Sequence, residues 1–186
     1  MALKDMIGME LRKTVIMIGM MGAGKTAVGK ELARMLAVPF RDSDQEIVQA
    51  ARMTIAEIFA RDGEAFFRAR EAEVIARLLR DRPSVLSVGG GAFLNADTRA
   101  LISELGVSVC LQADLDLLWT RVRHKNTRPL LRTANPRKTL AELLELRAPI
   151  YALADLMVEA KPDYAIPDTA RAVLAALRTR PDVLGE

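Results

Sequence analysis

The chain has 186 residues, of which 51% are hydrophobic and 27% charged, a composition typical of a globular domain with a substantial core. Its net charge of +3 is too mild to indicate a particular class of partner. The single cysteine, Cys110, excludes an intramolecular disulfide. The lack of an apolar run near the ~18 residues that span a bilayer excludes a membrane helix, so we expect a cytoplasmic protein.

The first predicted elements surround a glycine-rich turn. An apolar run over residues 13–18 predicts a strand, and residues 25–36 predict a helix. The turn between them, GMMGAGKT at 19–26, matches G-x-x-x-x-G-K-[ST] in the expected strand-to-helix context. Its glycines allow backbone N–H groups to approach a polyphosphate, and the helix N-terminus favours an anion. Lys25 can then reach the outer phosphates, and the Thr26 hydroxyl can bind Mg²⁺.

Two acids follow the next predicted strand, residues 38–41. Asp42 and Asp44 are separated by one residue, so one can reach a metal while the other accepts a proton or hydrogen bond from a substrate hydroxyl. The alternative is a helix cap, with Ser43 or Asp44 starting a helix over 45–51. A second helix is expected to start after Thr54 and to break at Asp62-Gly63, before a long helix over 64–79.

The second half of the chain continues to alternate strands with helices. Strands are expected at 84–88, 107–111 and 156–159, and helices at 96–105, 115–122, 139–154 and 169–178. We expect Asp168 to cap the last helix, and Pro149 to break the one before it. Residues 1–12 are read as a short extension. This alternation predicts an α/β fold, with a mainly parallel five-stranded sheet between two layers of helices.

Ligands bind beyond the carboxyl ends of the strands in such sheets, so three segments are expected to face one crevice. They are the turn at 19–26, the acids at 42–44 and a triple glycine at 89–91. Gly89, Gly90 and Gly91 can bring backbone N–H groups close to a ligand, although a plain turn remains the alternative.

Basic residues supply the remaining candidates. Arg68 and Arg147 could grip an anionic substrate or could simply lie on the surface. The window 123–138 lacks acids and apolar periodicity, so we expect a long loop. Arg128, in the sequence RPLL, could belong to a lid that closes over the transferred phosphoryl group and excludes water.

Six segments, in order, resemble those of the shikimate kinases: GMMGAGKT, FRDSD, DGEAFFRARE, VLSVGGGA, RPLL and LRAPIY. The resemblance covers about residues 13–177. It implies a P-loop kinase fold and the transfer of the γ-phosphoryl group of ATP to the 3-hydroxyl of shikimate, with Mg²⁺ as the metal.

The resemblance also implies roles for individual residues. ATP binding is implied for Gly22, Ala23, Gly24, Lys25, Thr26, Ala27, Arg121 and Arg128. Shikimate binding is implied for Asp44, Arg68, Gly89, Gly90, Gly91 and Arg147. Lys25, Asp44 and Arg128 are the implied catalytic residues, and Thr26 and Asp42 (through water) the implied metal contacts. The adenine contacts are less defined, with Arg123 as the alternative to Arg121, and with Lys161 or Pro167 in the C-terminal loop.

The expected organisation is a single kinase domain over 1–186, with substrate-binding helices at about 43–80 and a lid at about 123–138. We expect a monomer that binds small molecules and neither nucleic acid nor membrane. Two alternatives remain. Another small-metabolite kinase, such as a gluconate kinase, should lack the arginine pair beside the triple glycine. A nucleotide-binding regulator that uses the basic loop on nucleic acid should carry aromatic residues among the basic ones.

Overall fold

The structure, a computed structural model, describes residues 9–124 and 129–185. Its centre is a five-stranded parallel sheet, which confirms the predicted fold class. In spatial order the strands are β3 (Phe40–Asp42), β4 (Val85–Ser87), β2 (Thr14–Ile18), β5 (Gly106–Gln112) and β6 (Leu156–Glu159).

The middle strand, β2, is buried along its whole length. It pairs with β4 on one side and β5 on the other, with Ile16 beside both Leu86 and Ser108. Helices cover both faces of a parallel sheet, so a central strand reads as a continuous apolar run rather than an alternating one. Cys110 lies in this core, 2% exposed, as expected for a structural thiol, and burial raises its pKa to about 11.

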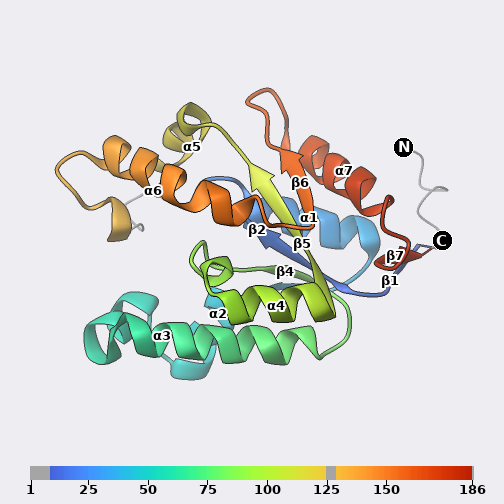
Figure 1. The fold of residues 1–186 in the computed structure, drawn as a ribbon, viewed down its shortest axis with the longest axis horizontal. Coiled ribbons are helices and arrows are strands. Elements are labelled where there is room, and N and C mark those ends of the chain that lie inside the picture. Colours follow the sequence, from blue (N-terminus) through green and yellow to red (C-terminus); the bar gives the residue numbers. More distant parts are fainter. Residues whose placement is uncertain (1–8, 125–128, 186) are drawn as a thin grey trace.

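Helices form a layer on each face of the sheet (Figure 1). On one face α1 (Lys25–Leu36) packs against α7 (Ile166–Leu177), and on the other α4 (Ala96–Leu105) packs against β5. The last helix starts earlier than predicted, because Ala165 is its N-cap and Asp168 lies in its first turn. The Asp168 carboxylate accepts a hydrogen bond from the Ala165 N–H at 2.9 Å.

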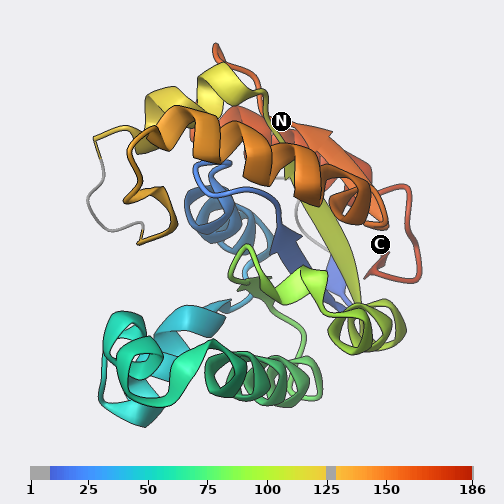
Figure 2. The same ribbon diagram turned by 60° about the vertical axis from the view of Figure 1, so that its left-hand side comes forward.

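Two helices, α2 (Ser43–Ala51) and α3 (Ile55–Leu79), lie together at one side of the molecule (Figure 2). They have a small apolar cluster of their own, made by Ile47, Ile58 and Phe67. The predicted start at Thr54 is confirmed by a capping box with Glu57, and the predicted break is confirmed at Gly63, where φ is +83°.

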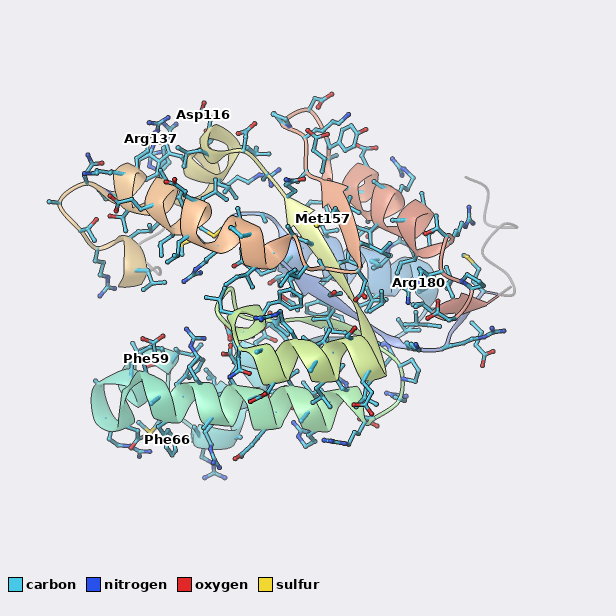
Figure 3. All side chains as sticks on the ribbon, viewed as in Figure 1. Phe59, Phe66, Asp116, Arg137, Met157 and Arg180 are labelled. Atoms are coloured by element: carbon cyan, nitrogen blue, oxygen red, sulfur yellow. The ribbon has the colours of Figure 1, made fainter. Side chains whose placement is uncertain are left out.

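Opposite them lie α5 (Leu115–Val122), the short 3₁₀ helix η3 (Pro129–Leu131) and α6 (Pro136–Tyr151). An ion pair of 2.8 Å between Asp116 and Arg137 joins α5 to α6 at the surface (Figure 3). The prediction for α6 was wrong at its start, because Asn135 caps the helix and Pro136 occupies the first turn, where its missing N–H costs nothing. Pro149 lies near the end of α6 without breaking it.

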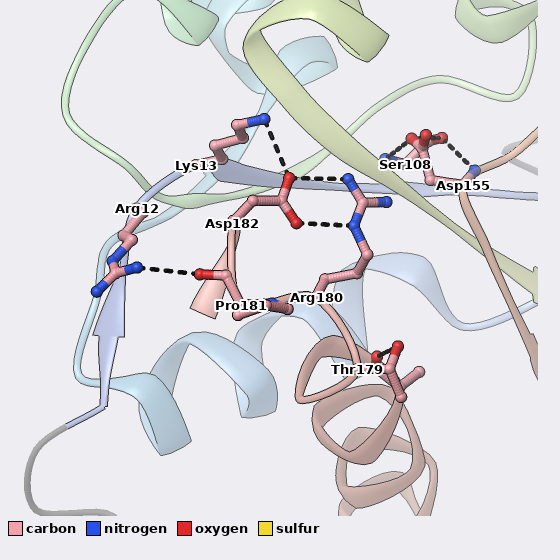
Figure 4. Close-up of polar contacts among 9 residues, drawn as sticks. Arg12, Lys13, Ser108, Asp155, Thr179, Arg180, Pro181 and Asp182 are labelled. Carbon is pink, nitrogen blue, oxygen red and sulfur yellow. Dashed lines mark hydrogen bonds and ion pairs between the residues drawn. The ribbon is translucent and has the colours of Figure 1, made fainter. Parts of the chain in front are cut away.

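The reading of residues 1–12 as a short extension was also wrong for residues 10 and 11, while residues 1–8 lie outside the described part of the chain. β1 (Glu10–Leu11) pairs antiparallel with β7 (Leu184–Gly185) in a second, two-stranded sheet. Around it the Lys13 ammonium lies 3.2 Å from Asp182, and the Arg12 guanidinium donates to the Pro181 carbonyl at 3.1 Å (Figure 4).

Within the described part of the chain, no helix combines the length and the apolar character needed to cross a membrane.

Candidate active site

A cleft of about 590 Å³ lies at the carboxyl ends of the parallel strands. The three segments expected to meet there all line it: the glycine-rich turn, the acids after β3 and the triple glycine after β4. Arg68, Arg121 and Arg147 line it as well, so the cleft brings together side chains from α1, α2, α3, α5 and α6.

The glycine-rich turn needs glycine for steric reasons. Gly19 and Gly22 have φ of +131° and +86°, and a methyl group on Gly19 would lie 2.6 Å from the Leu111 carbonyl oxygen. The Lys25 ammonium reaches back over the turn and donates to the carbonyls of Gly19 at 2.9 Å and Met20 at 3.1 Å. A cation is therefore held over the mouth of a loop that ends at a helix N-terminus, an arrangement suited to an anion.

Arg121 approaches the same turn from α5. Its guanidinium donates to the carbonyls of Gly22 and Ala23, each at 3.3 Å. Arg123, the alternative left open by the sequence, is exposed and does not line the cleft. The geometry thus favours Arg121 as the basic residue of this helix beside the turn.

Three oxygen-bearing side chains meet at the N-terminus of α1. The Thr26 hydroxyl lies 3.3 Å from Asp42 Oδ2 and 3.4 Å from the Ser87 hydroxyl. Among the described residues no group of three or more His, Cys, Asp or Glu could hold a metal ion. A hydroxyl and carboxylate set that leaves room for phosphate oxygens and water fits Mg²⁺, which prefers oxygen ligands and keeps several waters.

Asp42 is also the N-cap of α2, which corrects the expectation that Ser43 or Asp44 caps this helix. Its Oδ1 accepts hydrogen bonds from the N–H groups of Asp44 at 3.1 Å and Gln45 at 3.4 Å, while Oδ2 faces Thr26. The helix-cap reading and the metal reading of this acid are therefore compatible, because its two oxygens face different partners.

Arg68 projects from α3 toward the triple glycine. Its guanidinium donates to Glu71 at 2.7 Å and to Glu64 at 3.1 Å. A methyl group on Gly91 would lie 2.6 Å from the guanidinium carbon, so glycine is required for this close approach. Two carboxylates thus hold Arg68 against the backbone of residue 91.

Glu71 is 2% exposed and one of its oxygens, Oε1, has no hydrogen-bond partner among the described residues. Burial raises the pKa of this carboxyl, although Arg68 counteracts it. A methyl group on Gly89 would lie 2.7 Å from Glu71 Oε1 and 3.1 Å from Asp44 Oδ1. Gly89 therefore lies against two carboxyl groups.

Arg147 is the most buried charged group of the cleft apart from Glu71. It is 8% exposed, and its Nε has no hydrogen-bond partner among the described residues. One of its terminal nitrogens lies 3.4 Å from the position that a methyl group on Gly90 would occupy. Since an unpaired buried donor is costly, this guanidinium is suited to receive an anion from the cleft.

The far end of the cleft is formed by the C-terminal loop and α7. Tyr164, Ile166 and Thr169 line it there, whereas Lys161 and Pro167, the alternative candidates for an adenine contact in this part of the chain, do not. Arg128 lies outside the described residues. Leu130, in the adjacent η3 helix, lines the cleft and is 50% exposed.

The sequence model of the shikimate kinase family matches residues 21–178, nearly the whole described chain. The chain belongs to the shikimate kinase family. A shikimate kinase of Cereibacter sphaeroides is 65% identical over 94% of this chain and 87% of its own length. A shikimate kinase of Ruegeria pomeroyi is 63% identical over 94% of this chain and 89% of its own length.

Comparison with solved structures supports the same family assignment. A shikimate kinase from Acinetobacter baumannii in complex with shikimate superposes with a TM-score of 0.85 at 36% identity, covering 90% of this chain and 93% of that one. A gluconokinase from Sinorhizobium meliloti superposes with a TM-score of 0.62 at 18% identity, covering 91% of this chain and 94% of that one. At that identity the second likeness shows the fold alone, so the alternative of a gluconate kinase gains no support from it.

Several cleft residues were missed by reasoning from the sequence. Ser87 reads as an interior position of an apolar strand, and its contact with Thr26 spans 61 positions. Glu71 reads as one of many acids on an exposed helix, although its spacing of three from Arg68 is a usable signal for an ion pair. Tyr164 lies in a loop without a motif.

Proposed function

We propose that this member of the shikimate kinase family transfers the γ-phosphoryl group of ATP to the 3-hydroxyl of shikimate, giving shikimate 3-phosphate and ADP. The observation that carries the proposal is the buried Arg147 guanidinium, with its unpaired Nε, beside the triple glycine in the same cleft as the phosphate-binding turn. A small acceptor with one carboxylate and several hydroxyls matches this cleft, because Arg68 and Arg147 can bind the carboxylate and Asp44 can bind a hydroxyl.

At the acceptor end, Arg147 and Arg68 bind the carboxylate. Guanidinium groups suit this task because their donors match a carboxylate in pairs. Glu71 and Glu64 restrict Arg68, so little side-chain freedom remains to be lost on binding. Gly89, Gly90 and Gly91 line the acceptor, since the absence of side chains lets it reach both arginines.

Asp44 binds the acceptor hydroxyls and takes the proton from the attacking oxygen. Its position beside Gly89, on the acceptor side of Asp42, supports this role. The phosphoryl group needs an in-line nucleophile and little covalent help, so orienting the hydroxyl is the main contribution of such an acid.

At the donor end, Gly22, Ala23, Gly24, Lys25, Thr26 and Ala27 bind the phosphates of ATP. On nucleotide binding, Lys25 exchanges the loop carbonyls for phosphate oxygens and stabilises the charge of the transferring group. Arg121 and the surface formed by Tyr164, Ile166 and Thr169 bind the adenosine part. Arg128, which belongs to the lid in this proposal, completes the donor site.

Thr26 would hold Mg²⁺ directly, with Asp42 and Ser87 acting on it through water. Bound there, the ion supplies charge neutralisation on the phosphate oxygens. The domain over 1–186 acts as a cytoplasmic monomer on these small molecules, and its basic window raises the local concentration of anionic substrates.

The function is tested by incubating purified protein with ATP, Mg²⁺ and either shikimate or gluconate, and following ADP release with a coupled assay. We expect turnover with shikimate and only background with gluconate. Turnover with gluconate alone would contradict the proposal.

Gly91→Ala is expected to raise KM for shikimate about tenfold or more, the effect of losing one charge-assisted hydrogen bond. The methyl group would displace the Arg68 guanidinium, which is the flexible end of a side chain, so the fold should persist. The backbone of Gly91, with φ of −92°, is accessible to alanine. Steady-state kinetics for both substrates would measure the effect, and KM for ATP should stay constant.

Arg68→Ala provides the control for the Gly91 variant. If Gly91→Ala acts by displacing Arg68, adding it to Arg68→Ala should cause little further loss. Full additivity of the two effects would show that the methyl group disturbs the site by another route.

Asp42→Asn is expected to leave the fold intact, because asparagine caps a helix as well as aspartate does. The Mg²⁺ concentration for half-maximal activity should rise about tenfold, the lower end of the range for a group that acts on a metal indirectly. Asp97→Asn, in the exposed first turn of α4, removes a carboxylate elsewhere and should leave the Mg²⁺ dependence unchanged. An unchanged Mg²⁺ dependence in Asp42→Asn would limit Asp42 to its capping role.

A further inference from the structure

Tyr151, the last residue of α6, has no part in the site as described so far. Its side chain is buried, 4% exposed, and its hydroxyl donates a hydrogen bond of 2.6 Å to the carbonyl oxygen of Gly90. The bond joins positions 61 residues apart, from the end of a helix to the middle of the triple glycine. The Tyr151 hydroxyl therefore joins α6 to the backbone of the triple glycine, in addition to the packing of the buried ring.

Arg147 and Tyr151 are four residues apart on α6 and therefore lie on the same face of the helix. Their polar ends reach the same point. A methyl group on Gly90 would lie 3.4 Å from an Arg147 terminal nitrogen and 3.5 Å from the Tyr151 oxygen. One helical turn thus supplies both a cation for the cleft and a donor for the neighbouring backbone.

The hydrogen bond also determines how the peptide group between Gly90 and Gly91 faces. The chain has no cis peptide bond among its described residues, and in a trans peptide the C=O and N–H groups point in opposite directions. Holding the Gly90 carbonyl on Tyr151 therefore turns the Gly91 N–H away from the Tyr151 hydroxyl. Between two glycines this orientation has little steric restriction of its own, since neither residue has a side chain.

We infer that Tyr151 is a positioning residue for the acceptor carboxylate: by holding the Gly90 carbonyl beside Arg147, it aims the Gly91 N–H and the Arg147 guanidinium at the same anion. The inference rests on the proposed function, in which this anion is the carboxylate of shikimate. Burial raises the pKa of the Tyr151 hydroxyl, and Arg147 partly offsets this effect.

Tyr151→Phe tests the inference, because it removes the hydroxyl and keeps the buried ring. We expect binding of shikimate, measured by calorimetry, to weaken about tenfold, which is the effect of one hydrogen bond to a charged-group site. KM for ATP should change less than twofold. An unchanged shikimate affinity in a folded variant would overturn the inference.

A second ligand separates positioning of the carboxylate from general loosening of the cleft. An analogue whose carboxylate is replaced by hydroxymethyl should bind wild type and Tyr151→Phe alike, so the preference for shikimate over the analogue shrinks in the variant. Equal weakening of both ligands would mean that the hydroxyl supports the cleft as a whole, and would contradict the role stated here.

Leu140→Val is the matched structural control, since Leu140 is fully buried in the same helix and lines no part of the cleft. It should lower Tm without changing shikimate affinity. If it weakens shikimate binding as much as Tyr151→Phe at a similar loss of Tm, loosening of α6 explains both and the inference fails. The proposed function is judged separately, by whether wild-type protein turns over shikimate.

Discussion

Lys25→Met is expected to lower kcat by about 10²- to 10³-fold or more, the loss found when one preorganised charge-stabilising donor is removed. Methionine retains the length of the aliphatic stem but carries no charge. The Lys25 ammonium is already held over the phosphate-binding turn by the carbonyls of Gly19 and Met20, so the wild-type site needs little reorganisation when a phosphate replaces them. ADP release at saturating substrates measures the effect.

Lys30→Met provides the control for the loss of one positive charge. Lys30 is exposed on the same helix, with its ammonium over the Phe40 ring, and does not line the cleft. We expect its kcat to stay within about twofold of wild type. Substantial activity in folded Lys25→Met would remove Lys25 from the catalytic residues, and failure of the variant to fold would make Lys25 a structural residue.

Arg147→Ala is expected to weaken shikimate binding by about 10²-fold or more, with KM for ATP changed only a few-fold. Truncating one partner of a buried, hydrogen-bonded charge pair costs about 2–5 kcal/mol, and here the partner is the ligand. The side chain is 8% exposed with an unpaired Nε, so the pair forms away from water, where it is worth most.

Arg70→Ala is the matched control for the Arg147 variant. Arg70 is half exposed on α3 and pairs with Glu73 at 2.6 Å, outside the cleft. Its removal should change neither substrate constant. Equal loss of ATP and shikimate affinity in Arg147→Ala would contradict a role restricted to the carboxylate, and a thermal unfolding curve would show whether the variant is folded.

The order and type of the central elements could be predicted from the sequence, because each depends on local signals. The apolar run of β2, the capping box at Thr54 and the break at Gly63 are all contained within a few residues. The start of α6 at Pro136 was missed because the basic residues hid a short capping signal, Asn135-Pro136.

Contacts between distant residues could not be predicted in the same way. The Thr26–Ser87 contact and the Tyr151–Gly90 hydrogen bond each span 61 positions, and the β1–β7 pairing involves only two residues on each strand. The double use of Asp42 shows a further limit, since a capping acid and a metal-facing acid look identical in sequence.

The β1–β7 ladder has a practical consequence for handling the protein. Glu10 pairs with Gly185, and β1 leads into β2 from the end of the sheet opposite the cleft. A linker that joins residues 185 and 9 would therefore be short and would run behind the substrates, which makes the fold suitable for circular permutation. A fusion partner, or a link to a solid surface, at residue 9 or residue 185 would leave the entrance of the cleft open to solvent.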